Sequence, residues 1–218
     1  MKRSALLLLC VAACLAQQTH PVTGREIAQV MSASGADWLE RPEREAEEHP
    51  REAIAAMHIA KGATVADVGA GSGYLSRLLA AAVGPTGTVW CSDIQPRMLE
   101  ILRDKMQAAG IVNYRAVLGS DTDPRLPEGQ MDLILLADVY HEFAHPRDML
   151  RRLRLALRPG GRLVLLEYRK EDPNVPIREE HKMAVSTVRR ELEPEGFHFE
   201  QAIETLPRQH LLIFRRRD

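Results

Sequence analysis

The sequence predicts an α/β fold with a doubly wound, mainly parallel sheet that ends in an antiparallel hairpin. From residue 62 onward, strand-like apolar runs alternate with helical patterns, which is typical of right-handed βαβ units. The run 133–136 is apolar at every position, as expected for a strand that is covered on both faces. A chain of 218 residues is long enough for one domain with a substantial core.

The elements follow from local patterns and from the turns between them. Short apolar runs predict strands at 64–68, 88–93, 114–118, 131–138 and 162–168. Helical spacing predicts helices at 74–83, 96–108 and 146–157, and glycine and proline at 84–87 and 158–161 end two of them. Two further runs, 197–205 and 210–214, predict the terminal hairpin.

Residues 1–16 have the layout of a signal peptide or a lipoprotein leader. Lys2 and Arg3 precede an apolar stretch that is too short to span a bilayer. The segment 11–14 is similar to a lipobox, so Cys14 would be lipidated and would anchor the protein to a membrane. Cleavage after Ala16 is an alternative. We therefore expect an exported or membrane-anchored protein, or a cytoplasmic one if the start codon is misplaced and translation begins at Met31.

Composition excludes some partners. The formal net charge of -1 gives no global field that would attract nucleic acid. Cys91 is the single cysteine beyond the leader, and no Cys/His spacing indicates a metal, so we expect no metal site.

Residues 17–60 are expected to form a helical extension that could act as a lid through Trp38, Arg41 and Arg44, and 61–218 to form the main domain.

The stretch 65–76, VADVGAGSGYLS, predicts a ligand-binding loop at the end of the first strand. Glycines at 69, 71 and 73 permit positive φ and let a ligand approach the backbone. The dinucleotide fingerprint GxGxxG requires a third glycine where this chain has Tyr74. Asp67 stands before the first glycine, and a carboxylate there would repel a pyrophosphate but suits a cation. The loop therefore disfavours a nicotinamide cofactor.

The DxGxGxG arrangement at 67–73 resembles that of class I S-adenosylmethionine-dependent methyltransferases. The resemblance covers roughly 60–170 and is to the small-molecule, type 11-like branch that includes quinone-biosynthesis and arsenite methyltransferases. It implies a Rossmann-like, seven-stranded, mainly parallel sheet, with S-adenosyl-L-methionine as cofactor. It also implies methyl transfer to a small-molecule acceptor, whose identity the sequence does not reveal.

The resemblance also assigns cofactor-binding roles. Gly69, Gly71 and Gly73 would let the backbone approach the methionine part, and Asp67 would act near its amino group, directly or through water. Asp93, which ends the second strand, would accept hydrogen bonds from the ribose hydroxyls.

Three more positions complete the implied cofactor site. Ile94 would contact the adenine, and the segment with Ser120 and Asp121 would face the same ring. For Asp121, a cap on the turn before Pro124 is an equal alternative.

The polar segment after the fourth strand, 138–143, should face the transferable methyl group, because ligands in open α/β sheets lie beyond the carboxyl ends of the strands. Asp138 is expected at the cofactor. His141 is the first candidate for a general base, with Tyr140 and Glu142 as weaker ones. The alternative is that His141 caps a helix or packs under the cofactor.

Residues 141–145 match HExxH literally, but Pro146 follows directly. A continuous helix through both histidines is therefore not expected, and metallohydrolase chemistry is disfavoured. Two functional alternatives stay open: a nicotinamide-dependent oxidoreductase, and an exported S-adenosylmethionine-binding protein without turnover. The oligomeric state is not predicted.

Overall fold

The computed structural model describes residues 18–217. The leader at 1–16, with Cys14, lies outside this range. Within 18–217, none of the helices combines the length and the apolar character that a membrane crossing needs.

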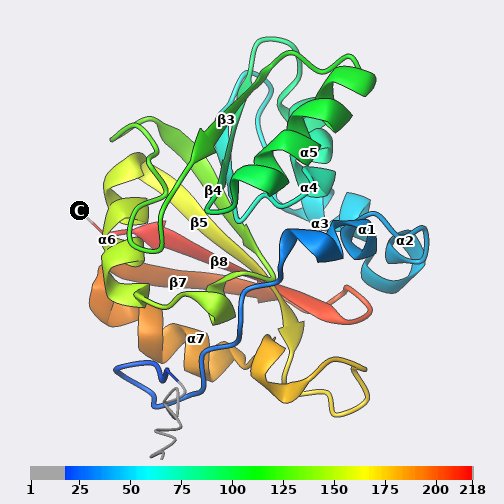
Figure 1. Cartoon of the computed structure of the whole chain (residues 1–218). Helices are drawn as coiled ribbons and strands as arrows, with labels where there is room; N and C mark the ends of the chain where they lie inside the picture. Colours follow the sequence, from blue (N-terminus) through cyan, green and yellow to red (C-terminus); the bar gives the residue numbers. More distant parts are fainter. Residues whose placement is uncertain (1–17, 218) are drawn as a thin grey trace, which may run out of the picture.

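A single mixed sheet forms the centre of the described chain (Figure 1). Its strand order is β3-β2-β1-β4-β5-β8-β7, and the two-residue strand β6 pairs with β5. The parallel strands are β1 (Thr64–Val68), β2 (Thr88–Asp93), β3 (Tyr114–Leu118), β4 (Met131–Ala137), β5 (Leu157–Arg169) and β6 (Lys182–Met183). β7 (Phe197–Ile203) and β8 (Gln209–Arg216) are antiparallel to each other, and β8 is antiparallel to β5.

Helices cover both faces of the sheet (Figure 1). On one face, α3 (Pro50–Ala56), α4 (Tyr74–Val83) and α5 (Pro96–Ala108) bury residues such as Leu79 and Leu102 against β1 and β2. On the other face, α6 (Pro146–Ala156) and α7 (Val185–Leu192) bury Leu150 and Leu192 against β4 and β5. Because both faces are covered, Leu133–Leu136 alternate between two apolar cores, which confirms the prediction from their sequence.

The predicted fold class is confirmed, and the larger differences lie at the start of β5 and in the segment after it. The bounds of β1, β2, β3, α4 and α5 agree with the expected ranges, whereas β5 begins five residues earlier than predicted, at Leu157. The sequence analysis did not predict β6 or α7, because the preceding segment contains Pro173 and Pro176 and reads as a loop. The hairpin is present, and its second strand lies inside the sheet.

The N-terminal extension contains η1 (Ala33–Gly35), α1 (Ala36–Leu39) and α2 (Arg44–Glu48) ahead of α3. Figure 1 shows α1 and α2 beside α3, on the side of the molecule where the parallel strands end. The segment before them is tied to α7, because Arg25 Nε donates to the buried Glu191 at 3.0 Å. The extension is thus fixed at both of its ends to the α/β core.

Candidate active site

A cavity of about 580 Å³ lies beyond the carboxyl ends of β1, β2, β4 and β5. Strand order reverses between β1 and β4, and this point is where open α/β sheets bind their ligands. The volume lies within the range of small-molecule sites. The lining comes from the lid residues around Trp38, the glycine loop, the segments after β2, β3 and β4, and the loop that holds His181.

Two glycines shape the floor of the cavity. Gly69 has φ +75°, and a Cβ there would lie 2.5 Å from Val139 Cγ2. Gly71 has φ +52°, and a Cβ would lie 2.8 Å from Leu39 Cδ1, which belongs to the lid. Both positions therefore need glycine, for conformation and for space. They leave bare backbone at the cavity, as the sequence analysis expected.

Asp93 joins the loop to the end of β2. Its Oδ2 accepts from Gly71 N at 2.9 Å, and its Oδ1 accepts from Gln95 N at 2.8 Å. Burial raises the pKa of Asp93, and these backbone donors oppose the shift. Each oxygen keeps a further lone pair for a vicinal diol. Ile94, beside it, exposes 42% of its surface, and both residues line the cavity.

Ser120 and Asp121 also line the cavity. Ser120 Oγ accepts from Asp123 N at 3.1 Å and so caps its own turn. Asp121 is exposed, and its Oδ2 lies 3.5 Å from His145 Nε2. The turn-capping role thus falls to Ser120 rather than to Asp121, whose predicted contact with adenine stays a prediction.

Asp67 and Gly73 lie beneath the loop rather than in the cavity lining. Asp67 is 2% exposed, and its Oδ2 accepts from Ser76 Oγ at 2.5 Å. Burial raises its pKa to about 6, against the opposing effect of Ser76. A Cβ on Gly73 would lie 2.8 Å from Leu102 Cγ, so Gly73 lets α5 approach the loop. In this arrangement both residues support the loop, and their contact with a cofactor stays a prediction.

Asp138 has an unusual backbone and side chain. Its φ of +51° is uncommon for a residue with a side chain, although Asp tolerates it. Oδ2 accepts from Gln209 Nε2 at 2.7 Å, while the buried Oδ1 has no partner among the described residues. Burial and the charge of Glu48 raise its pKa well above the ordinary value, against the effect of Arg44. Asp138 lines the cavity, as expected.

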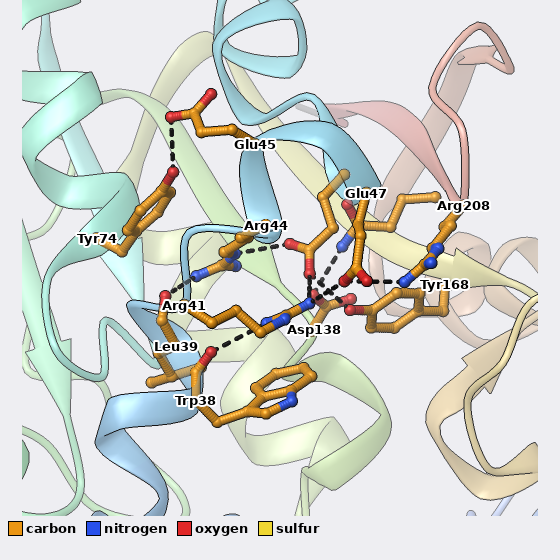
Figure 2. Close-up of polar contacts among 12 residues, drawn as sticks. Trp38, Leu39, Arg41, Arg44, Glu45, Glu47, Tyr74, Asp138, Tyr168 and Arg208 are labelled. Carbon is orange, nitrogen blue, oxygen red and sulfur yellow. Dashed lines mark hydrogen bonds and ion pairs between the residues drawn. The ribbon is translucent and has the colours of Figure 1, made fainter.

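The lid is held near Asp138 by a group of charged residues that we name the Glu48 cluster: Arg41, Arg44, Glu48 and Tyr168. Glu48 accepts from Arg41 Nη2 at 2.6 Å, from Arg44 Nε at 2.6 Å and from Tyr168 Oη at 2.8 Å. Figure 2 shows Arg41 reaching toward Asp138 and Tyr168, while Arg44 lies beside Leu39 and donates to its carbonyl. Trp38 stacks with Arg41, whose Cζ lies 3.8 Å from the ring centroid. The lid is therefore anchored to β5 by buried contacts.

His141 is 1% exposed and lies in η2 (Tyr140–Glu142), at the cavity wall. Its Nδ1 donates to Glu167 Oε2 at 2.6 Å, and its Nε2 lies 3.0 Å from His181 Nδ1. Burial alone would lower the pKa of His141, but the charge and hydrogen bond of Glu167 raise it. Burial and the charge of His141 lower the pKa of His181. Both ring nitrogens of the predicted base are thus engaged.

The two weaker candidates, Tyr140 and Glu142, differ in position. Tyr140 is fully buried outside the cavity lining, with its hydroxyl 3.4 Å from His20 Nε2 and Arg25 over its ring. Glu142 lines the cavity. Burial and Glu167 raise its pKa to about 7, against the effect of His141. Geometry favours Glu142 over Tyr140 for any contact with a ligand.

The literal HExxH match does not form a helical zinc motif. η2 ends at Glu142, and α6 begins at Pro146, after the exposed His145. The two histidines therefore do not share one helical face, as Pro146 predicted.

Sequence reasoning assigned no firm site role to Glu167 or Glu48. Glu167 was a strand-end residue in the sequence, but it holds His141 through Oε2 and accepts from Tyr140 N through Oε1 at 3.0 Å. Glu48 lies in the acid-rich run 40–52, whose composition gave no sign of burial, yet it is only 2% exposed. For Glu167, the position of a carboxylate at the carboxyl end of a central strand was an available signal.

The sheet order, the glycine loop and Asp93 around one cavity form the arrangement that the resemblance to class I S-adenosylmethionine-dependent methyltransferases implied. Residues 66–163 match the family model described as "Methyltransferase domain". This match over 66–163 confirms the resemblance to S-adenosylmethionine-dependent methyltransferases that the sequence indicated.

A curated relative and two solved structures are similar to this chain. The ubiquinone/menaquinone biosynthesis C-methyltransferase UbiE of Burkholderia mallei (strain SAVP1) is 33% identical over 117 residues, which cover 54% of this chain and 48% of the relative. The chain thus spans about half the length of the curated relatives it matches. A SAM-dependent methyltransferase from Aquifex aeolicus has a TM-score of 0.81 at 24% identity, over 86% of this chain and 100% of that one. The [4+2]-cyclase SpnF has a TM-score of 0.66 at 13% identity, over 78% and 80%. Both structures share the fold.

Proposed function

We propose that the protein transfers a methyl group from S-adenosylmethionine to a small-molecule acceptor. The carrying observation is that the Gly69–Gly71 loop with Asp93, and the residues Glu142 and His181, line the same cavity. The curated relatives are named as C-methyltransferases of ubiquinone and menaquinone biosynthesis, which supports a small-molecule acceptor.

The residues around the cavity suit the cofactor. Gly69 and Gly71 line the cavity without side chains of their own, and the Asp93 oxygens keep lone pairs for ribose hydroxyls. Ile94 offers an exposed apolar face to adenine. The bound cofactor supplies a methyl group on a positively charged sulfur, and the carboxylate of Asp93 at the cavity complements positive charge.

The chain's own contribution to transfer is orientation and exclusion of water. Trp38 and Leu39 of the lid line the cavity, and closing an apolar wall over two reactants aligns them and removes competing water. His141 keeps the predicted role of a base as part of this proposal. Its Nε2 can accept a proton only when the contact with His181 is released, because the two nitrogens lie 3.0 Å apart.

Calorimetric titration of the full-length chain with S-adenosylmethionine, S-adenosylhomocysteine and NAD tests the cofactor. We expect micromolar binding of the two sulfur ligands and none of NAD. Asp93→Ala removes the diol acceptor and one partner of Gly71 N, so affinity should fall at least tenfold, about 1.4 kcal/mol. The exposed Asp104→Ala on α5 is the matched control and should bind normally.

Three outcomes would change the proposal. Binding of NAD alone would favour the nicotinamide-dependent oxidoreductase. Binding of both sulfur ligands with no methyl transfer to any molecule in a broad acceptor panel would favour the S-adenosylmethionine-binding protein without turnover. If His141 is a base, His141→Ala should lower turnover while cofactor binding stays intact. Turnover equal to that of the parent would show that His141 is not the base.

For location, we propose export or anchoring through the leader and Cys14. Mass spectrometry of the mature N-terminus tests this, and an intact Met1 or a start at Met31 would contradict it.

A further inference from the structure

We propose that His141, Glu142 and His181 bind a divalent transition-metal ion at the wall of the cavity. The three residues come from η2 and from η3 (Glu179–His181), which β5 and its following loop bring together. Their ligand atoms all lie within 4.8 Å of one another, and the three residues line the cavity. The set differs from the literal HExxH match, because His181 replaces His145.

The two imidazoles are already spaced as ligands of one ion. His141 Nε2 and His181 Nδ1 are 3.0 Å apart, and two nitrogens at about 2.05 Å from one ion would then subtend roughly 95°. The ring planes are inclined by 86° with centroids 4.9 Å apart. His181 is half-buried on a loop, so a small rotation of its ring can exchange the hydrogen bond between the imidazoles for two bonds to a metal.

Glu167 supplies the outer support that metal-binding histidines commonly have. Its Oε2 accepts from His141 Nδ1 at 2.6 Å, which leaves Nε2 as the nitrogen that faces His181 and the site. Its Oε1 accepts from Tyr140 N at 3.0 Å, so the fully buried carboxylate fixes both the ring and the backbone of η2. The imidazole is thus oriented before any ion binds.

The donor set selects the class of ion. Two imidazoles and one carboxylate suit Zn²⁺, Co²⁺, Mn²⁺ or Fe²⁺, whereas Mg²⁺ prefers an all-oxygen environment. Three protein ligands leave further coordination positions that open into the cavity. If the proposed function holds, an oxygen of the acceptor would take one of these positions. His141 would then act as a ligand in place of a base, because its Nε2 cannot bind an ion and accept a proton at the same time. That consequence rests on the proposed function, but the metal site itself does not.

Titration of the untagged, EDTA-treated full-length chain with Co²⁺, followed by visible absorption, tests the site. We expect saturable binding of one ion per chain, displaced by Zn²⁺ and unaffected by excess Mg²⁺. His181→Ala and Glu142→Gln should each weaken Co²⁺ binding at least tenfold. Both side chains are half-buried, so these variants should keep the fold, which circular dichroism checks. His145→Ala is the control and should bind as the parent does, because His145 lies outside the site.

The proposal is overturned if Co²⁺ does not bind saturably, if His181→Ala and Glu142→Gln bind it as the parent does, or if Mg²⁺ displaces it. The three residues would then form a hydrogen-bonded group only. Calorimetry with S-adenosylhomocysteine on the same samples separates this result from the proposed function. A chain that binds this ligand but no Co²⁺ overturns the metal site alone, and a chain that binds Co²⁺ but neither sulfur ligand overturns the proposed function alone.

Discussion

Position 69 requires glycine for two separate reasons, its backbone conformation and the lack of space for a side chain, and the sequence alone does not distinguish them. Its φ of +75° favours glycine, and a Cβ would also lie 2.5 Å from Val139 Cγ2, a branched side chain that follows β4. Gly160 has nearly the same φ, +73°, but a Cβ there would meet nothing within 4 Å. Comparing Gly69 with Gly160 therefore separates the free-energy cost of a positive φ from the cost of steric overlap with a neighbouring side chain.

We therefore expect Gly69→Ala to destabilise the protein more than Gly160→Ala. Both variants carry the left-handed backbone cost of roughly 1–2 kcal/mol. Gly69→Ala adds overpacking against Val139, typically 1–3 kcal/mol. Urea unfolding measures the free energy of unfolding of both variants. Equal midpoints would show that the Val139 side chain can move aside for the added methyl group without loss of stability.

At the level of elements, the structure joins α2 to β5 through the Glu48 cluster. Tyr168 on β5 is 3% exposed and donates to Glu48 Oε1 at 2.8 Å, while Arg41 and Arg44 bind the same carboxylate from the lid. Tyr74 makes a chemically similar bond, to Glu45 Oε1 at 2.7 Å, but its acceptor is exposed. Of these two tyrosine hydrogen bonds, only the one from Tyr168 is made to a buried carboxylate.

Tyr168→Phe should accordingly cost about 1–3 kcal/mol, because a buried carboxylate loses a donor. Tyr74→Phe should stay within about 0.5 kcal/mol, since water replaces the lost hydroxyl. Chemical denaturation gives both values, and amide hydrogen exchange over 33–48 should accelerate in Tyr168→Phe alone. Unchanged exchange in that variant would mean that the arginines alone hold the lid.

For the molecule as a whole, a buried carboxyl makes stability depend on pH. Burial raises the pKa of Asp67 from 3.8 to about 6. Between these values the folded state binds more protons than the unfolded state, so the free energy of unfolding falls as pH rises through this window. Over the whole window, this pKa shift lowers the free energy of unfolding by about 3 kcal/mol.

Asp67→Asn removes this titration and keeps an acceptor for Ser76 Oγ. Its free energy of unfolding, relative to that of the parent, should rise by up to about 3 kcal/mol from pH 4 to pH 7. Urea unfolding at several pH values checks this, with Asp104→Asn on the exposed face of α5 as control. If the parent and Asp67→Asn show parallel pH curves, the carboxyl of Asp67 does not titrate in this range.

Local pattern was enough to predict much of the fold. The bounds of β1 and α4 agree with the sequence because glycines, a proline and apolar spacing mark both ends within a few residues. β8 was predicted as half of a hairpin, but its place beside β5 depends on pairing over some 50 residues, such as Leu165 with Leu212. Strand order at that edge has no local signal.

The site shows the same limit. Asp93 was predicted because it ends a strand next to a recognisable loop. The contact of His141 with His181 spans 40 positions, and that of Glu48 with Tyr168 spans 120. Residues so far apart leave no local pattern in the sequence, so the partners of the polar lid residues could not be predicted.

The interior position of β8 has a consequence for how the chain folds as it is made. β8 lies between β5 and β7, although it follows both in the sequence. Until residues 209–216 leave the ribosome, β5 has an open apolar edge where Leu163 and Leu165 will later pair. Such an edge can add a strand from another chain. The nascent protein should therefore depend on a chaperone, or on rapid completion of synthesis, to avoid aggregation at that edge.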